Sequence, residues 1–179
     1  MALILSVDPG PVQSAYLLYD PEAMTYPLVA LTSGKVENAV LRQRLRTDKI
    51  LSCAPVLVIE KVEHYGMPVG REVFDTVFWS GRFVEAWGGS YGAGPCALLP
   101  RREAKLHLCR SPKATDATIR QALLDQFGGK EHAIGKKKAP GPLYGIHKDL
   151  WSCLALAVTY AAHASQKECS YCGWATREE

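Results

Sequence analysis

Two short apolar runs, each ending in a carboxylate, constrain the fold of this chain more than any other feature. The first run, Ala2–Val7, ends at Asp8, and the second, Val56–Ile59, ends at Glu60. Runs this apolar are typical of strands buried on both faces of a sheet. A carboxylate is costly inside such a strand, but at the end of the strand it can point into a cleft and bind a cation. We therefore expect Asp8 and Glu60 to share a cleft at the ends of adjacent strands.

A third acid, Asp149, opens an apolar helix that is expected to extend to about residue 164. A carboxylate at the start of a helix is favoured by capping and by the helix dipole, so Asp149 alone could be only a cap. In the order strand-Asp, strand-Glu and helix-Asp, however, the three acids predict an oxygen-rich site for Mg²⁺ or Mn²⁺.

The remaining pattern predicts an α/β domain with a mixed central sheet flanked by helices. One domain is expected over residues 1–164, followed by a tail over residues 165–179. Residues 128–146 are rich in Gly, Pro and Lys, and are expected to form a mobile loop. The expected strands cover residues 2–8, 13–20, 26–35, 56–60 and 96–99, and the expected helices cover residues 37–52, 72–87, 101–109, 112–127 and 149–164.

Composition is that of a globular chain with a sizeable core. The 179 residues are 47% hydrophobic and 22% charged, with a net charge of +3. Local basic clusters, such as Lys136–Lys138, could be solvated faces or phosphate contacts. No apolar run is long enough for a membrane span, the start of the chain does not resemble a signal peptide, and the cysteines form no dense disulfide framework. These features predict a cytoplasmic protein.

Five motifs, taken in order, resemble the RuvC family of Holliday junction resolvases, within the RNase H-like superfamily. The compact phage-type members are the most similar. No single motif is specific for the family, but the order and spacing of the five motifs over residues 2–164 are specific when taken together. The motifs are Leu5–Gly10 on the first strand, Val58–Val62 on the central strand, Phe78–Arg82 on the helix after it, Arg102–Lys105 at a basic helix start, and Leu154–Thr159 on the last helix.

The resemblance implies an RNase H-like fold and a nuclease that nicks four-way DNA junctions. It implies two Mg²⁺ or Mn²⁺ ions held by Asp8, Glu60 and Asp149, with Lys105 at the scissile phosphate. Such ions activate water and stabilise the leaving 3′ oxygen, so the products should carry 5′-phosphate and 3′-hydroxyl ends. Paired nicks also imply a homodimer. If the chain is phage-encoded, it would work in the cytoplasm of the bacterial host.

Two positions depart from the family pattern. The family usually places a second acid three residues after the first one on the last helix, and here that position is Ser152. Either Asp149 serves for both acids or His147 contributes from the preceding turn. The second departure is Asp116, which stands where the family would have a lysine. Asp116 could cap its helix or add a fourth acid near the site.

A Cys-x-x-Cys pair near the end of the chain, Cys169 and Cys172, suggests a zinc site. His163 is a candidate third ligand, and Cys53, Cys109 or a second subunit could supply the fourth. The alternatives are a frayed, reduced tail and, with less support from the surrounding sequence, a redox-active pair.

Three other functions are compatible with parts of the pattern. One is another RNase H-like nuclease that cuts RNA–DNA hybrids, flaps or branches with the same acids. A second is a sugar kinase-like or actin-like ATPase, but such proteins need two lobes and a much longer chain. The third is a protein that binds junctions without cutting them, which the missing acid at Ser152 would favour.

Overall fold

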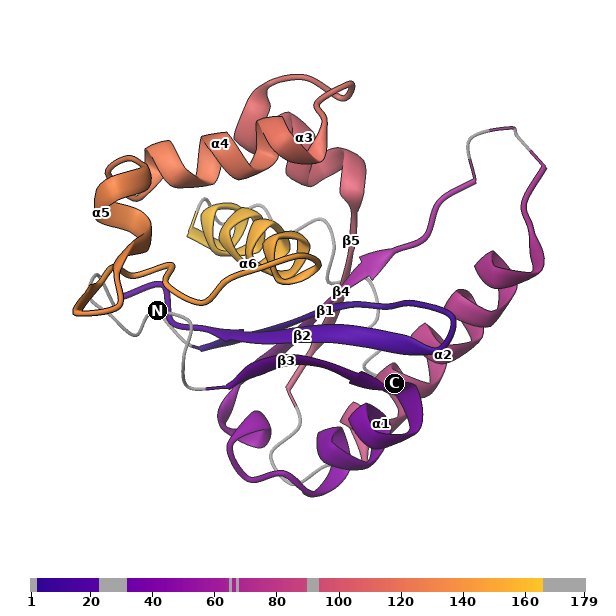
Figure 1. Cartoon of the computed structure of the whole chain (residues 1–179). Coiled ribbons are helices and arrows are strands. Elements are labelled where there is room, and N and C mark those ends of the chain that lie inside the picture. Colours follow the sequence, from indigo (N-terminus) through magenta and orange to yellow (C-terminus); the bar gives the residue numbers. More distant parts are fainter. Residues whose placement is uncertain (1–2, 23–31, 65, 67, 90–93, 166–179) are drawn as a thin grey trace.

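A five-stranded mixed sheet forms the centre of the molecule (Figure 1). The computed structural model describes residues 3–22, 32–64, 66, 68–89 and 94–165. In the order β3-β2-β1-β4-β5, the first three strands are antiparallel neighbours, and β4 and β5 run parallel to β1. The mixed sheet confirms the predicted α/β class. The strands are β1 (Ile4–Asp8), β2 (Gln13–Tyr19), β3 (Ser33–Glu37), β4 (Val56–Lys61) and β5 (Cys96–Pro100).

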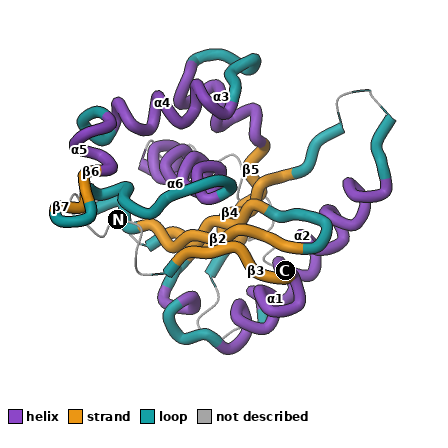
Figure 2. Tube along the Cα trace, in the orientation of Figure 1, coloured by secondary structure: helices purple, strands orange, loops and turns teal. Residues whose placement is uncertain are grey.

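Helices cover both faces of this sheet (Figures 1 and 2). On one face α1 (Asn38–Thr47) packs against α2 (Arg71–Gly88). On the other face α6 (Leu150–Ser165) lies directly against β1 and β2, and outer helices pack on it. None of the described helices is long and apolar enough to span a membrane. The outer helices are α3 (Arg101–Cys109), α4 (Asp116–Gln126) and the short α5 (Lys130–Ile134).

Alternation along the strands divides the core into two layers. Because successive strand side chains point to opposite faces, Ile4, Val56 and Val58 pack beneath α6. The alternate positions of the same two strands, Leu5, Val7, Leu57 and Ile59, pack against α1 and α2. All four residues of the second apolar run are buried, as expected for a strand covered on both faces. Each large side chain buried in these layers contributes roughly 1.5–3 kcal/mol to stability. On the α1–α2 side, the side chains of Phe83 and Trp87 are at most 1% exposed.

The expectation of a mobile loop over residues 128–146 is wrong. This segment contains α5 and a small antiparallel hairpin formed by β6 (Gly135–Lys136) and β7 (Ala139–Pro140). Buried Ala133 and Leu143 attach the segment to the core, and the Leu143 amide donates to the Ala133 carbonyl at 2.7 Å. The glycines that suggested a loop supply the turns instead, as at Gly135, whose φ is +67°.

Two other boundaries differ from the expectation. The helix expected over residues 37–52 ends at Thr47, where the Asp48 carboxylate accepts a hydrogen bond from the Ile50 amide at 2.9 Å and starts a new turn. A 3₁₀ turn, Leu51–Cys53, then leads into β4. The strand expected over residues 26–35 is seen as β3, and residues 26–31 lie outside the described residues.

Candidate active site

The parallel register of β1 and β4 places Asp8 beside Glu60. The two strands pair from Ile4 with Val56 to Val7 with Ile59, so Asp8 and Glu60 occupy the next position along the ladder. Neighbouring strands lie about 4.8 Å apart. Both acids fall on even-numbered positions, which face α6. The two carboxylates predicted from the sequence therefore point from adjacent strand ends to the same side of the sheet.

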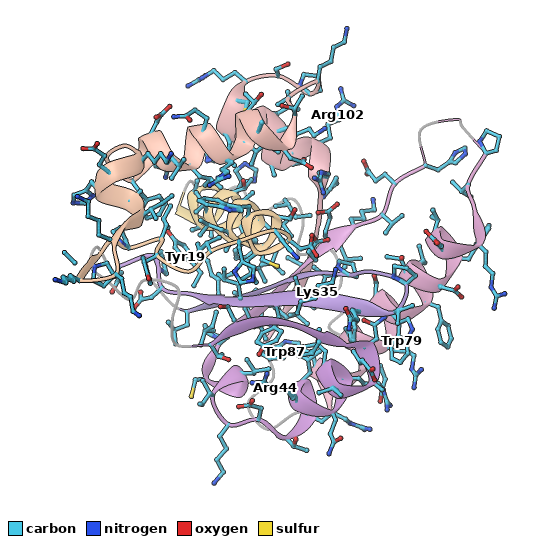
Figure 3. All side chains as sticks on the ribbon, in the orientation of Figure 1. Tyr19, Lys35, Arg44, Trp79, Trp87 and Arg102 are labelled. Carbon is cyan, nitrogen blue, oxygen red and sulfur yellow. The ribbon has the colours of Figure 1, made fainter. Side chains whose placement is uncertain are left out.

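The same row of residues continues across the sheet to Lys35 on β3. Asp8 pairs with Ala15, and Ala15 pairs with Lys35. The Lys35 side chain, labelled in Figure 3, reaches the residue that precedes α6: its Nζ lies 2.7 Å from Asp149 Oδ2. Lys35 thus fixes the start of α6 over the row that contains both strand acids. Sequence reasoning missed this lysine because its role depends on pairing across three strands.

The start of α6 brings Asp149 and Ser152 to the strand acids. Asp149 directly precedes the helix, and its carbonyl accepts hydrogen bonds from the amides of Ser152 at 3.0 Å and Cys153 at 3.2 Å. The Ser152 side chain hydrogen-bonds the carboxylate of Asp8. The residue that replaces the expected second acid is therefore inside the site, where it binds a carboxylate through a hydroxyl instead of adding a charge.

A cavity of about 640 Å³ opens between the strand ends and the helices. It contains every acid singled out from the sequence, together with His147. Lys105 lies instead in an adjoining cavity of about 530 Å³, which shares Glu60 and Arg101 with the first. His147 is exposed, and its Nδ1 lies 2.8 Å from the Gly145 carbonyl oxygen. The polar residues that line the larger cavity are Asp8, Glu60, Arg101, Asp116, Arg120, His147, Lys148, Asp149 and Ser152.

Asp8 is the most perturbed carboxyl group of the cavity. Burial raises its pKa to about 7, and the neighbouring charges of Glu60 and Asp149 add to the rise. The positive charge of Arg101 and the hydrogen bond from Ser152 oppose it. Near neutral pH this carboxyl group therefore exchanges between its neutral and charged forms, which is typical of a functional site.

Arg101 is the residue that sequence reasoning most clearly missed. Its Nη1 lies 3.5 Å from Glu60 Oε2 and its Nη2 lies 2.5 Å from Asp116 Oδ1. Burial raises the pKa of Glu60, and the charge and hydrogen bond of Arg101 oppose that rise. A signal was present in the sequence. Arg101 directly follows the strand β5, just as Asp8 and Glu60 stand at the ends of the apolar runs of β1 and β4.

The donors of the cavity fit a divalent cation in their chemistry. Mg²⁺ and Mn²⁺ prefer carboxylate oxygens, and a cation would offset the burial and the neighbouring negative charges that together raise the pKa of Asp8. In the part of the chain that the structure describes, however, no three His, Cys, Asp or Glu residues form a group that could hold a metal. Salt bridges hold three of the four acids: Arg101 contacts Glu60 and Asp116, and Lys35 contacts Asp149. A bound ion would be held by Asp8, and Asp149 could join it only by exchanging its salt bridge with Lys35.

The predicted zinc site cannot be placed. Cys169 and Cys172 lie outside the described residues. His163, the candidate third ligand, packs edge-on against His107, with 5.4 Å between ring centroids. Within residues 3–165, apart from the gaps given above, Cys53 and Cys109 are free cysteines and no metal-binding group includes them. The structure gives zinc no support.

Comparison with known proteins identifies the fold. No model of a known protein family matches the chain, and no curated protein sequence does. Among solved structures, RuvC from Thermus thermophilus matches with a TM-score of 0.65 at 15% identity, covering 92% of this chain and 96% of RuvC. T. thermophilus RuvC in complex with its Holliday junction substrate matches with the same TM-score and identity, covering 94% and 98%.

The class that fold and cavity define is thus an α/β protein with the RNase H-like fold. The particular arrangement is that of RuvC, and it extends over nearly the whole of both chains. The resemblance predicted from the sequence is confirmed at the level of the fold.

Proposed function

We propose that this chain is a divalent-metal-dependent endonuclease that cuts branched DNA, with four-way junctions as its main substrate. The observation that carries the proposal is the convergence of Asp8, Glu60 and Asp149 from two parallel strand ends and one helix start into one cavity. The fold likeness to RuvC, which has been solved with a Holliday junction substrate, supports this choice of substrate.

In this proposal Asp8, Glu60 and Asp149 hold the metal. When bound, divalent ions supply activation of water and stabilisation of the charge that develops on the phosphate and the leaving oxygen. Ser152 orients the Asp8 carboxylate through its hydrogen bond. The exposed His147 lies at the same cavity and is a second candidate for contact with metal or water.

Basic residues beside the acids would hold the DNA backbone. Lys105 and Arg102 line the adjoining cavity together with Glu60. Contacts of lysine and arginine with phosphate oxygens fix the position of DNA without reading its sequence. We therefore assign Lys105 to the phosphate at or next to the cleaved bond. Asp116 acts on the site through Arg101, which it holds in place.

A homodimer would supply the two active sites that paired nicks require. The outward face of α2 supports this part of the proposal, because it exposes large apolar side chains one helical turn apart. Phe74 is 65% exposed, Val77 is 50% exposed and Phe78 is 63% exposed. Apolar stripes of this kind usually mark contact surfaces, and we propose a second copy of the chain as the occupant.

A junction-binding protein that does not cut is the second candidate function. It is favoured by one observation: Ser152 stands where an acid is expected, and both Glu60 and Asp149 are held in salt bridges with residues of the chain. This candidate and the nuclease share the same DNA surface, so only a cleavage assay separates them.

The test is cleavage of labelled four-way junctions, flaps, RNA–DNA hybrids and linear duplex in Mg²⁺ or Mn²⁺. The nuclease proposal expects selective cutting of the junction, which Glu60→Gln reduces by roughly two to four orders of magnitude. Glu85→Gln is the matched control: it removes the same charge from α2 on the opposite face, where Glu85 pairs with Arg42. Tight binding without cutting would favour the second candidate, and preferred cutting of hybrids would make the chain a ribonuclease.

A further inference from the structure

Arg101 is a positive charge built into the acid cavity. It is the first residue of α3 and follows β5 directly, so the backbone places it at the strand edge that also holds Asp8 and Glu60. Its guanidinium contacts Glu60 and Asp116 at the same time, and 35% of its side chain is exposed. An arginine held by two carboxylates keeps its charge and its planar orientation. Arg101 is therefore a fixed cation and not a mobile surface charge.

The charges of the cavity disfavour the binding of two divalent ions. Its four carboxylates, from Asp8, Glu60, Asp116 and Asp149, bring four negative charges when all are ionised. Salt bridges with Arg101 and Lys35 cancel two of them. Arg120 and Lys148 line the same cavity, so its positive side chains already match its carboxylates in number, and each divalent ion adds positive charge to a partly buried site.

The oxygen donors gather at one position and favour a single ion. Among the described residues, Asp8 is the carboxylate of this cavity that has no salt-bridge partner. Glu60, with 17% of its side chain exposed, is engaged by Arg101. Ser152 contributes a neutral hydroxyl where another acid would have helped to hold a second ion. The oxygen donors thus gather around Asp8, and a cation already stands on the Glu60 side.

We propose that Arg101 takes the place of one of the two metal ions, so that the site binds a single divalent ion per chain. The inference rests on the proposed function, in that it requires the cavity to bind a divalent ion. Arg101 also lines the neighbouring cavity with Lys105, so its exposed edge can face a phosphate there. The bound ion would supply one positive charge centre to the phosphate, and Arg101 would supply the other in place of a second ion.

Calorimetric titration of the metal-free protein with Mn²⁺ tests this without any activity measurement. We expect one ion per chain for the wild type and for Arg101→Lys, which keeps the charge. Arg101→Gln should bind a second ion, or bind the first roughly tenfold more tightly, because its acids lose their partner. Arg71→Gln is the control: it removes an exposed arginine of α2 that pairs only with Asp75 among the described residues.

Each other outcome contradicts a different claim. Two ions per chain in the wild type would overturn the inference about Arg101 and leave the metal-dependent nuclease standing. One ion with the same affinity in wild type and Arg101→Gln would overturn the role of Arg101. No binding to wild type or to Arg101→Gln would overturn both the inference and the metal dependence of the proposed function. Circular dichroism of each variant shows whether it is folded before titration.

Discussion

At the scale of single residues, the chain places a carboxyl group where burial and two like charges disfavour its ionisation. Asp8 meets the charges of Glu60 and Asp149 in a partly closed cavity, and its pKa rises to about 7. Carboxyl groups perturbed in this way are concentrated at functional sites. Arg101 and Lys35 reduce the repulsion among the other acids but make no salt bridge with Asp8.

The raised pKa of Asp8 predicts how the stability of the metal-free protein changes with pH. Between the ordinary value of 3.8 and about 7, the unfolded chain releases the Asp8 proton while the folded protein keeps it. The folded state binds more protons in this window, so this residue makes the free energy of unfolding fall as pH rises from about 4 to about 7.

Asp8→Asn should remove this decrease in the free energy of unfolding. Measured by urea unfolding with chelator, the variant should exceed the wild type at pH 8 by on the order of 1–4 kcal/mol, and the difference should shrink towards pH 4. Excess Mn²⁺ should stabilise the wild type and not the variant. A variant less stable than the wild type at pH 8 would show that burial and repulsion do not act on Asp8 as described.

At the scale of elements, the turn after Asp8 is held by a polar network that begins at α1. Buried Asn38 donates to the Gly10 carbonyl at 2.8 Å and accepts from the Ser14 hydroxyl at 2.6 Å. The Ser14 oxygen in turn accepts from the Gly10 amide at 3.1 Å. Gly10 is required here because a Cβ would lie 2.4 Å from the Gln13 carbonyl oxygen. This network fixes the backbone that follows Asp8.

Asn38→Ala should therefore weaken both stability and activity. It removes the donor that the Asn38 amide supplies to the Gly10 carbonyl and the acceptor that it supplies to the Ser14 hydroxyl, which costs about 2–3 kcal/mol in urea unfolding. Junction cleavage should also fall, because the Asp8 carboxylate is less well fixed. Gln43→Ala on the exposed face of the same helix is the control and should change neither quantity measurably. Equal effects of the two substitutions would contradict the role of the network.

The sequence predicted local elements well and long-range contacts poorly. The strands that end at Asp8 and Glu60 follow from their apolar runs, and α6 follows from its apolar stripe. The prediction for the segment 128–146 was wrong because its glycines indicate turns but do not show that Ala133 and Leu143 are buried in the core. Arg101 and Lys35 were missed because their roles come from strand register, which depends on residues far apart in the chain.

At the scale of the whole molecule, the apolar face of α2 lies on the opposite side of the sheet from α6 (Figure 1). Arg82 stacks on Phe78 and on Trp79, which is labelled in Figure 3, at 5.4 Å and 4.2 Å from the ring centroids. Stacked cations of this kind help to keep an aromatic surface soluble while leaving it available for contact. A dimer formed there would leave the acid cavity of each copy open to DNA.

The dimer predicts a concentration-dependent mass. In analytical ultracentrifugation at micromolar concentration, the wild type should sediment as a dimer and Phe78→Glu as a monomer, because a charge in the apolar contact is not paired. Ile50→Glu is the control: it changes an apolar residue that is 52% exposed, outside α2. A wild-type monomer, or dissociation by Ile50→Glu alone, would contradict an interface on α2.

The most direct test of the central claim is to map the nicks that the wild-type protein makes in a labelled four-way junction. With Mg²⁺ or Mn²⁺ the account predicts nicks at equivalent positions in two opposing strands, with 5′-phosphate and 3′-hydroxyl ends. The nicks should disappear with chelator and with Asp8→Asn. Cutting that survives chelator or Asp8→Asn, or equal cutting of linear duplex, would contradict a metal-dependent, junction-selective site at Asp8, Glu60 and Asp149.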